Sequence, residues 1–300
     1  MSAIVAITRA GPLATIQDAG RYGRLRDGIS ASGPMDGGAY RMAGALAGAD
    51  HGGIEFTMAG IELKLQSGQC RIGLAGGSFV ARHNGNIVDW PGSVLLEEGD
   101  DLAVTPGAAG NYGYLRFDHA LALPEIMGSI ATSSRARLGG LEGRQLRVGD
   151  VLELVPSTAG ASMPGLPPQA EQGPLRFIWG LHADLFEPAT RERFANASFA
   201  VSRQLDRMGV RLEDGEGVFA DATILSLVSD AIVAGDIQIL GDGTPIVLMR
   251  DHQPTGGYPR IGTIITADLD RFAQLRPGSL VTFSPVSVAH ARQILRSQQP

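Results

Sequence analysis

The sequence predicts a mainly β protein of two lobes with a few short helices. Short apolar runs typical of strands recur through both halves, and Gly, Asp or Asn stands in nearly every gap between them. Glycine is unusually frequent, at 41 of 300 residues, and follows no collagen-like period. The strands do not alternate with helices, which argues against a doubly wound sheet or a TIM barrel.

Eight runs in the first half are predicted strands, and one helix interrupts them. The strand-like runs are residues 3–7, 54–58, 61–66, 70–76, 78–82, 93–98, 101–106 and 112–117. The helix begins after Asp36, whose carboxylate can cap the first turn, and it ends at Gly48. Apolar residues at helical spacing between Tyr40 and Ala47 give it a face to bury.

A segment rich in Pro, Gly, Ala and Ser divides the chain. It lacks any apolar period and occupies residues 156–174. A length of 300 residues is enough for two domains of ordinary size. We therefore expect a first lobe at 1–157, a linker at 158–174 and a second lobe at 175–300.

The second half repeats the β pattern. Strands are predicted at residues 175–181, 198–202, 209–213, 223–229, 236–240, 245–249, 262–266 and 279–285. Short helices are predicted at 188–196, where Pro188 suits a first turn, at 268–275 and at 286–297.

Composition excludes several classes of function. The formal net charge is -6 and the basic residues are scattered, which argues against a nucleic-acid-binding surface. Cys70 is the one cysteine, so we expect a buried small side chain rather than a disulfide or a nucleophile. No apolar run approaches the roughly 18 residues that span a bilayer, and the first residues do not resemble a secretory signal. We therefore expect a soluble, cytoplasmic protein. We also expect no metal site, because the six His are isolated in sequence.

Two glycine-rich segments are candidate binding sites. DHQPTGGYPRIGT, residues 251–263, is either a shaped binding loop or a barrel corner, since Pro fixes φ and Gly permits positive φ or close approach. Residues 33–36, GPMD, begin a helix, where free N–H groups can hold an anion. Arg207 either clamps a carboxylate or pairs with an acid of the protein.

Four segments together resemble one family. They are residues 15–36, 139–150, 206–213 and 236–266, in that order and spacing. The family is the biotin-dependent carboxyltransferase family, which includes the second subunit of allophanate hydrolase, the C subunit of 5-oxoprolinase and part of the carboxyltransferase region of urea carboxylase. The resemblance extends over about residues 5 to 285.

The resemblance implies two cyclophilin-like β-barrel lobes and a heteromeric complex. The implied partner is a subunit-1 (B-type) protein, and in 5-oxoprolinase there is also a third, lactam-hydrolysing partner of the A type. That complex uses ATP to open 5-oxoproline to glutamate, whereas the carboxylase version moves CO2 from carboxybiotin to a urea or amide nitrogen. Because no nucleotide motif occurs here, we expect a partner to bind ATP. The chain has no biotinyl-lysine carrier segment, although biotin is a possible cofactor of the complex.

In the enzyme interpretation, the two segments hold a small amide. Gln253 would bond the amide edge, and Arg207 or Arg260 would stabilise developing negative charge. The candidate catalytic residues are Asp251, Gln253, Arg207 and Asp36. The candidate substrate-binding residues are Gly33, Pro34, Met35, Thr255, Gly256, Gly257, Tyr258 and Arg260.

Two other interpretations remain open. The chain could be a regulatory protein that binds its subunit-1 partner without turnover, as in relatives that antagonise a sporulation-kinase inhibitor. The glycine-rich loop could also be only a barrel corner, in which case Gly256→Ala would damage folding rather than activity.

Overall fold

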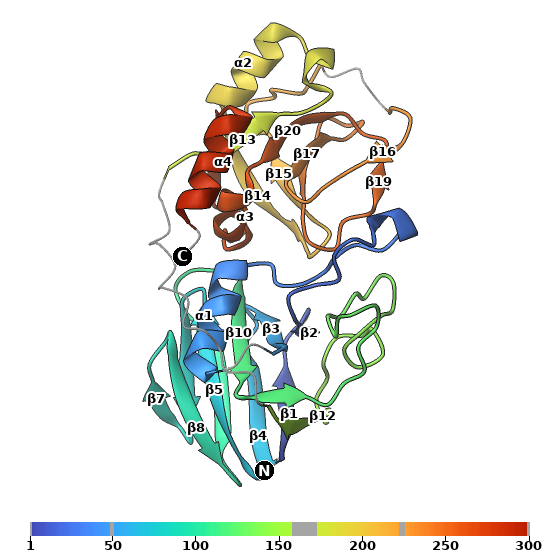
Figure 1. Cartoon of the computed structure of the whole chain (residues 1–300). Helices are drawn as coiled ribbons and strands as arrows, with labels where there is room; N and C mark the ends of the chain where they lie inside the picture. The colour runs from blue at the N-terminus through green and yellow to red at the C-terminus, as the bar shows by residue number, and fades with distance from the viewer. Residues whose placement is uncertain (1, 49–50, 158–172, 222–225, 299–300) are drawn as a thin grey trace. The chain divides into compact units, whose positions relative to one another are not determined.

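The computed structural model describes residues 2–48, 51–157, 173–221 and 226–298. The chain divides into two compact units, Met1–Tyr22 with Ala31–Pro167 and Gly23–Ser30 with Pro168–Pro300 (Figure 1). The predicted linker, 158–174, lies almost wholly outside the described residues. The short segment Gly23–Ser30, with the 3-10 helix η1 (Leu25–Asp27), groups with the second unit, whereas the predicted boundaries put it in the first lobe.

The first unit consists of two antiparallel sheets and one helix. Its seven-stranded sheet runs in the order β11 (His119–Leu121), β12 (Val151–Pro156), β1 (Ala3–Ala10), β4 (Ile61–Ser67), β9 (Asp101–Pro106), β6 (Phe79–His83) and β7 (Asn86–Val88). Its five-stranded sheet runs in the order β2 (Thr15–Gln17), β3 (Gly53–Thr57), β10 (Tyr112–Phe117), β5 (Gln69–Gly76) and β8 (Gly92–Glu97).

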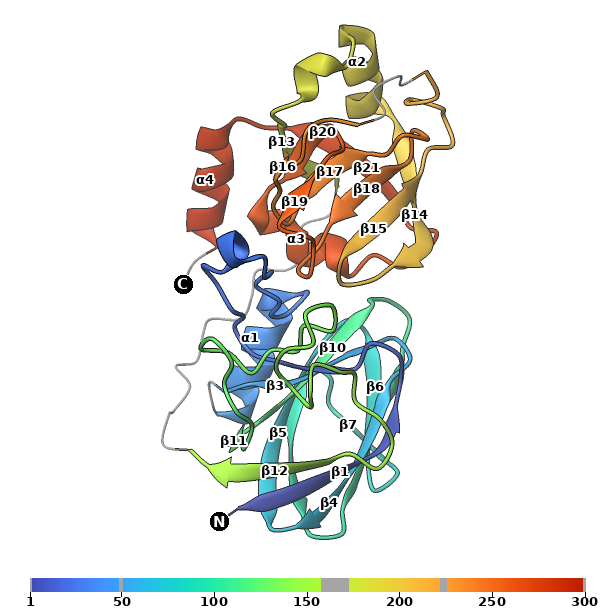
Figure 2. The same ribbon diagram turned by 90° about the vertical axis from the view of Figure 1, so that its right-hand side faces the viewer.

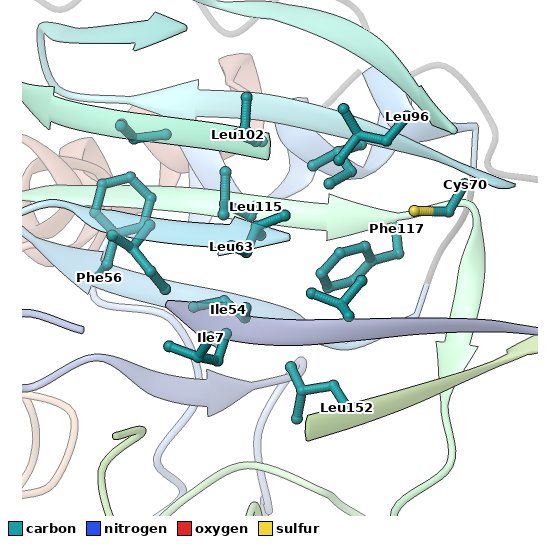
Figure 3. Close-up of a cluster of buried hydrophobic side chains, with 14 of the residues drawn as sticks. Ile7, Ile54, Phe56, Leu63, Cys70, Leu96, Leu102, Leu115, Phe117 and Leu152 are labelled. Carbon is teal, nitrogen blue, oxygen red and sulfur yellow. The ribbon is translucent and has the colours of Figure 1, made fainter. Parts of the chain in front are cut away.

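Both sheets of the first unit contribute to one hydrophobic core. Ile7 and Leu63 come from the seven-stranded sheet, and Phe56, Leu115 and Cys70 from the five-stranded sheet (Figure 3). Each of these side chains is at most 1% exposed. The alternation along each strand therefore places one apolar face of each sheet in the same interior.

Helix α1 (Gly37–Ala47) packs directly on strand β5. Asp36 caps it as predicted, with its Oδ1 accepting from the Ala39 N–H at 2.8 Å, and Gly48 ends it with a φ of 82°. Contact with the strand depends on Gly73, where a Cβ would lie 1.9 Å from the Ala43 carbonyl oxygen. The small residue thus permits the helix to approach the sheet backbone.

In the described ranges, the second unit contains a closed barrel, three α-helices and a separate two-stranded ribbon (Figure 2). The barrel order is β13 (Leu175–Trp179), β20 (Arg260–Ile264), β17 (Asp236–Ile239), β18 (Pro245–Leu248), β15 (Gly209–Glu213), β14 (Ser198–Leu205) and β21 (Leu280–Pro285). Strand β21 pairs in parallel with β13 and closes the ring. The ribbon pairs β16 (Asp230–Ala231) with β19 (Thr255–Gly256). The helical segments are α2 (Pro188–Asn196), α3 (Thr266–Ala273), α4 (Val288–Ser297) and the 3-10 helix η2 (Ala183–Leu185).

An aromatic cluster joins helix α2 to the barrel strands β13, β14 and β21. Phe194 of α2 lies 5.2 Å from Phe177, 5.0 Å from Phe283 and 5.7 Å from Phe199, measured between ring centroids. All four side chains are at most 2% exposed. Edge and offset ring contacts of this kind add to the burial of large apolar surface.

The mainly β prediction with a few short helices is confirmed, and one predicted strand is wrong. The four α-helices of the described ranges lie where the sequence indicates, although α3 begins two residues before the predicted 268–275. Residues 226–229 of the predicted strand 223–229 form no strand, and the rest of that segment lies outside the described residues. Val228 is 92% exposed, so the apolar run has no sheet to bury it. None of the described helices is both long and apolar enough to span a membrane.

Candidate functional site

The GPMD turn of the first unit has a strained, well-supported backbone. Ser32 has a φ of 55° and Gly33 a φ of 82°, so the chain passes through the left-handed region twice. A Cβ at Gly33 would also lie 2.9 Å from the Ala19 carbonyl oxygen. Glycine is therefore required at position 33 by conformation and by space.

The backbone donors of this turn are used inside the protein. The Gly33 N–H donates to Gln17 Oε1 at 3.0 Å, and the Met35 N–H donates to Glu55 Oε2 at 2.8 Å. The Asp36 N–H donates to the Tyr114 hydroxyl oxygen at 2.8 Å. The Gly33 N–H, at a position expected to bind substrate, is therefore already bonded to a buried glutamine.

The other three residues of the turn also serve the fold itself. They are Pro34, Met35 and Asp36. The Asp36 carboxylate caps α1, which is the competing role that the sequence allowed, and not that of an unengaged base. Pro34 and Met35 are buried. The turn is therefore a packed support in the first unit.

Glu55 and Tyr114 form a buried polar pair that the sequence did not indicate. The Tyr114 hydroxyl donates to Glu55 Oε2 at 2.9 Å, and both side chains are fully buried. Burial, together with the negative charges of Glu55 and Asp36, raises the pKa of Tyr114 well above its usual range. The phenol thus remains a neutral donor that fixes the carboxylate beneath the turn.

The QDAGR stretch just before the turn holds a long loop in place. Arg21, 1% exposed, donates to the carbonyl oxygens of Ile126 at 2.8 Å and Ala131 at 2.9 Å. Asp18 accepts from the Ser129 hydroxyl and from the Ile130 N–H, both at 2.7 Å. Arg21 and Asp18 therefore have a structural role, which is to hold residues 126–131 in place.

In the second unit, Arg207 and Asp251 form a buried ion pair. Arg207 Nε lies 2.9 Å from Asp251 Oδ2, and Arg207 Nη2 lies 3.1 Å from Asp251 Oδ1. Each residue is 5% exposed, and the Asp251 N–H also donates to the Arg207 carbonyl oxygen at 2.7 Å. Of the two roles that the sequence left open for Arg207, the structure shows pairing with an acid. Two of the three charged candidate catalytic residues are thus engaged with each other.

Gln253 follows in the same loop and differs from its neighbours. Its side chain is half-buried, and its amide makes no hydrogen bond with any other residue that the structure describes. Its main-chain oxygen lies 2.6 Å from His252 Nδ1. Gln253 therefore retains an amide donor and acceptor for a ligand.

The two adjacent glycines serve close packing. A Cβ at Gly256 would lie 2.5 Å from Gln238 Nε2, and one at Gly257 would lie 2.9 Å from the Leu227 carbonyl oxygen. Neither glycine has a positive φ. The Gly257 carbonyl oxygen accepts from the Leu227 N–H at 2.6 Å. Of the two explanations for glycine at these positions, close approach of another group is the one that the structure shows.

Arg260 is buried beneath the β16–β19 ribbon. It donates to Asp230 Oδ2 and to the Ala231 carbonyl oxygen, both at 2.7 Å, and lies 3.4 Å from Asp236 Oδ2. Its charge is therefore balanced by two acids of the protein, neither of which the sequence singled out. Thr255 and Tyr258 are the exposed residues of this loop, and Tyr258 is 40% exposed.

Neither metal binding nor thiol chemistry is supported in the described part of the chain. No group of three or more His, Cys, Asp or Glu is placed to hold a metal ion among the described residues. Cys70 is buried, and burial, aided by the charge of Asp118, raises the pKa of its thiol to about 12. The expected role of Cys70 as a small core side chain agrees with this placement.

Comparison with known proteins places the whole chain in one group. Residues 27–285 match the family described as the carboxyltransferase domain, subdomain A and B. The chain is 33% identical to the C subunit of 5-oxoprolinase from Escherichia coli (strain K12), over 98% of this chain and 94% of that protein. It is 32% identical to the C subunit of 5-oxoprolinase from Haemophilus influenzae, over 95% and 92% respectively. The crystal structure of K. lactis urea amidolyase superposes with a TM-score of 0.88 and 27% identity, over 98% of this chain and 19% of that one.

Proposed function

The chain belongs to the carboxyltransferase-domain family of subdomains A and B, and we propose that it is the C-type subunit of a heteromeric 5-oxoprolinase. The complex opens the ring amide of 5-oxoproline. Water supplies a hydroxyl to the carbonyl carbon and a proton to the ring nitrogen as the C–N bond breaks, and glutamate is released. ATP hydrolysis by the complex drives the step.

One observation carries this proposal. The matched segment makes up 94% and 92% of the two 5-oxoprolinase subunits but 19% of urea amidolyase. The relatives that correspond to this chain over nearly their whole length are thus subunits of a 5-oxoprolinase. Because these relatives are named as subunits, we infer that this chain also has partner chains, and we assign them to the B type and the A type.

Within this chain, Gln253 is the residue proposed to bond the amide edge of the substrate. Its unengaged side-chain amide supports that role. Thr255 and Tyr258 are exposed beside it and offer hydroxyl groups. Arg207 and Asp251 act as positioning residues, because their buried ion pair holds the loop.

A second candidate is carboxyl transfer from carboxybiotin to a urea nitrogen. It is favoured by the family description and by the K. lactis urea carboxylase structure, at a TM-score of 0.87 and 26% identity over 98% of this chain. The same Gln253 amide suits urea as well as a lactam, so the site residues do not separate the two reactions.

The test is glutamate release by the complex of this chain with its two partner subunits, given ATP and 5-oxoproline. Gln253→Ala is expected to lower kcat/KM about tenfold or more, because a polar substrate edge loses its partner. The matched control is Gln69→Ala, an exposed glutamine of β5 in the first unit. An assembled wild-type complex that releases no glutamate would refute the 5-oxoprolinase assignment. Transfer of labelled carboxylate from carboxybiotin to urea would then support the second candidate.

A further inference from the structure

A cavity of about 470 Å³ opens on the second unit, away from the glycine-rich loop in sequence. Its walls come from three places in the chain: the β14–β15 hairpin, the loop that follows β15, and the turn before β18. The polar side chains that line it include Ser202, Gln204, Arg211, Asp214, Asp242 and Thr244.

The walls are built by specific contacts. Asp214 accepts from the N–H groups of Val218 at 3.0 Å and Phe219 at 2.9 Å, which folds the loop back on itself. Phe219 is 1% exposed and belongs to the lining. Gly243 has a φ of 82°, and a Cβ there would lie 2.7 Å from the Phe219 carbonyl oxygen. Loop and turn therefore meet at fixed positions.

Arg211 is the cation of this cavity. It occupies an outward position of β15, between the buried Val210 and Leu212. Its guanidinium makes no hydrogen bond or ion pair with another residue in the described ranges. Arginine presents a planar fork that matches a carboxylate with two parallel hydrogen bonds. A ligand carboxylate can therefore bind here without displacing a protein group.

The opposite holds at the glycine-rich loop. Arg207 is paired with Asp251, and Arg260 with Asp230 and Asp236. A carboxylate ligand at either arginine would have to displace an acid of the protein from a buried guanidinium, which removes much of the gain from binding. Of these three arginines, only Arg211 offers its charge without that penalty.

Acceptors and donors surround Arg211. Asp242 Oδ1 accepts from the Thr244 N–H at 3.0 Å, and the Thr244 hydroxyl also bonds this exposed carboxylate. An ionised carboxylate has about four acceptor sites, so Asp242 can still accept from a ligand N–H. The hydrogen bonds from Thr244 and, to a lesser degree, the charge of Arg211 lower the pKa of Asp242, so it is ionised at neutral pH. Gln204 is exposed at the rim, and its side-chain amide bonds no other described residue.

We propose that this cavity binds an α-carbon that carries both a carboxylate and an N–H group. Arg211 holds the carboxylate, Asp242 accepts the N–H, and Gln204 bonds the remaining oxygen. Resting on the proposed function, the two compounds with this chemistry are the substrate 5-oxoproline and the product glutamate. Because Gln253 does not line this cavity, it is a second site for them, separate from the amide-binding loop. Glu213 and Asp214 add negative charge to the lining, which disfavours ligands with several negative charges, such as polyphosphates.

The experiment is a calorimetric titration of the full chain with 5-oxoproline and, separately, with glutamate. Arg211→Gln is expected to weaken binding about 10- to 100-fold, since a charged hydrogen-bond partner is removed. Arg211→Lys should recover part of the affinity. The control is Arg203→Gln, an exposed arginine of β14 outside the cavity, with an expected change of less than about twofold.

Two results would overturn the proposal: a wild-type chain that binds neither compound, or a folded Arg211→Gln chain that binds as tightly as wild type. Tighter binding of glutamate would assign the cavity to the product. Ser202→Phe, which fills the cavity from β14, gives a second variant if Arg211→Gln does not fold. Glutamate release by the complex is measured apart from this titration, so failure of the proposed reaction and failure of the cavity site remain distinguishable.

Discussion

Removal of Arg207 should destabilise the second unit far more than removal of an exposed arginine. Arg207→Met leaves Asp251 buried, 5% exposed, without the guanidinium that now lies 2.9 and 3.1 Å from its two oxygens. Breaking a buried ion pair from one side costs about 3–5 kcal/mol. For a unit of this size, that corresponds to a fall in Tm of roughly 6–20 °C.

Fluorescence can report on the second unit alone. The chain has two tryptophans, Trp90 in the first unit and Trp179 in the second, so a Trp90→Phe background isolates Trp179. Urea unfolding in that background gives the free energy of unfolding for each variant. The control, Arg203→Met, removes an exposed arginine and should change stability by less than about 0.5 kcal/mol.

The double variant Arg207→Met with Asp251→Leu should regain most of the loss, because apolar replacement of both partners removes the buried charge. An Arg207→Met loss no larger than that of Arg203→Met would refute the reasoning. A double variant as unstable as the sum of its single variants would do the same, since it would show no coupling between the two side chains.

Two further predictions concern the first unit. Gly73→Ala should lower its free energy of unfolding by more than about 2 kcal/mol, towards the upper range of overpacking, because the new Cβ meets a helix carbonyl at 1.9 Å. The control is Gln69→Ala, an exposed position of the same strand β5, and equal urea midpoints for the two variants would contradict the contact. Asp100 has a pKa lowered to about 2, chiefly by the Glu97 N–H, so its contribution to stability is present above about pH 4 and is lost as the pH falls towards about 2. An Asp100→Asn chain should show a shallower loss across that range, and an unchanged acid profile would exclude this contribution.

Local chemistry made much of the fold predictable from the sequence. Helix α1 follows from Asp36 as a cap, apolar residues at helical spacing and Gly48 as a stop, and each of these lies within a few residues of the others. The ribbon strands β16 and β19 escaped prediction because two residues each are too short to show alternation. Strand 223–229 was predicted from β-branched and apolar residues, but propensity alone cannot supply a partner strand for its described residues, 226–229.

The candidate site was predictable only as segments. The sequence singled out Arg207 and Asp251 separately, but their pairing across 44 residues depends on the fold. Arg211 has the sequence context of an ordinary outward residue of a strand, and nothing near it in sequence shows that a later turn completes a cavity. The role of a buried acid such as Glu55 cannot be predicted from the sequence for the same reason, because its hydrogen-bond donors come from distant elements.

Closure of the barrel sets a constraint on how this protein can be made. Strand β21 lies between β13 and β14, and it is the last strand of the second unit to leave the ribosome. Until it emerges, β13 and β14 both present unpaired backbone groups to other nascent chains. A stop codon or ribosomal stall before Leu280 would therefore expose two open edges at once, and such truncated chains should depend on chaperones or aggregate.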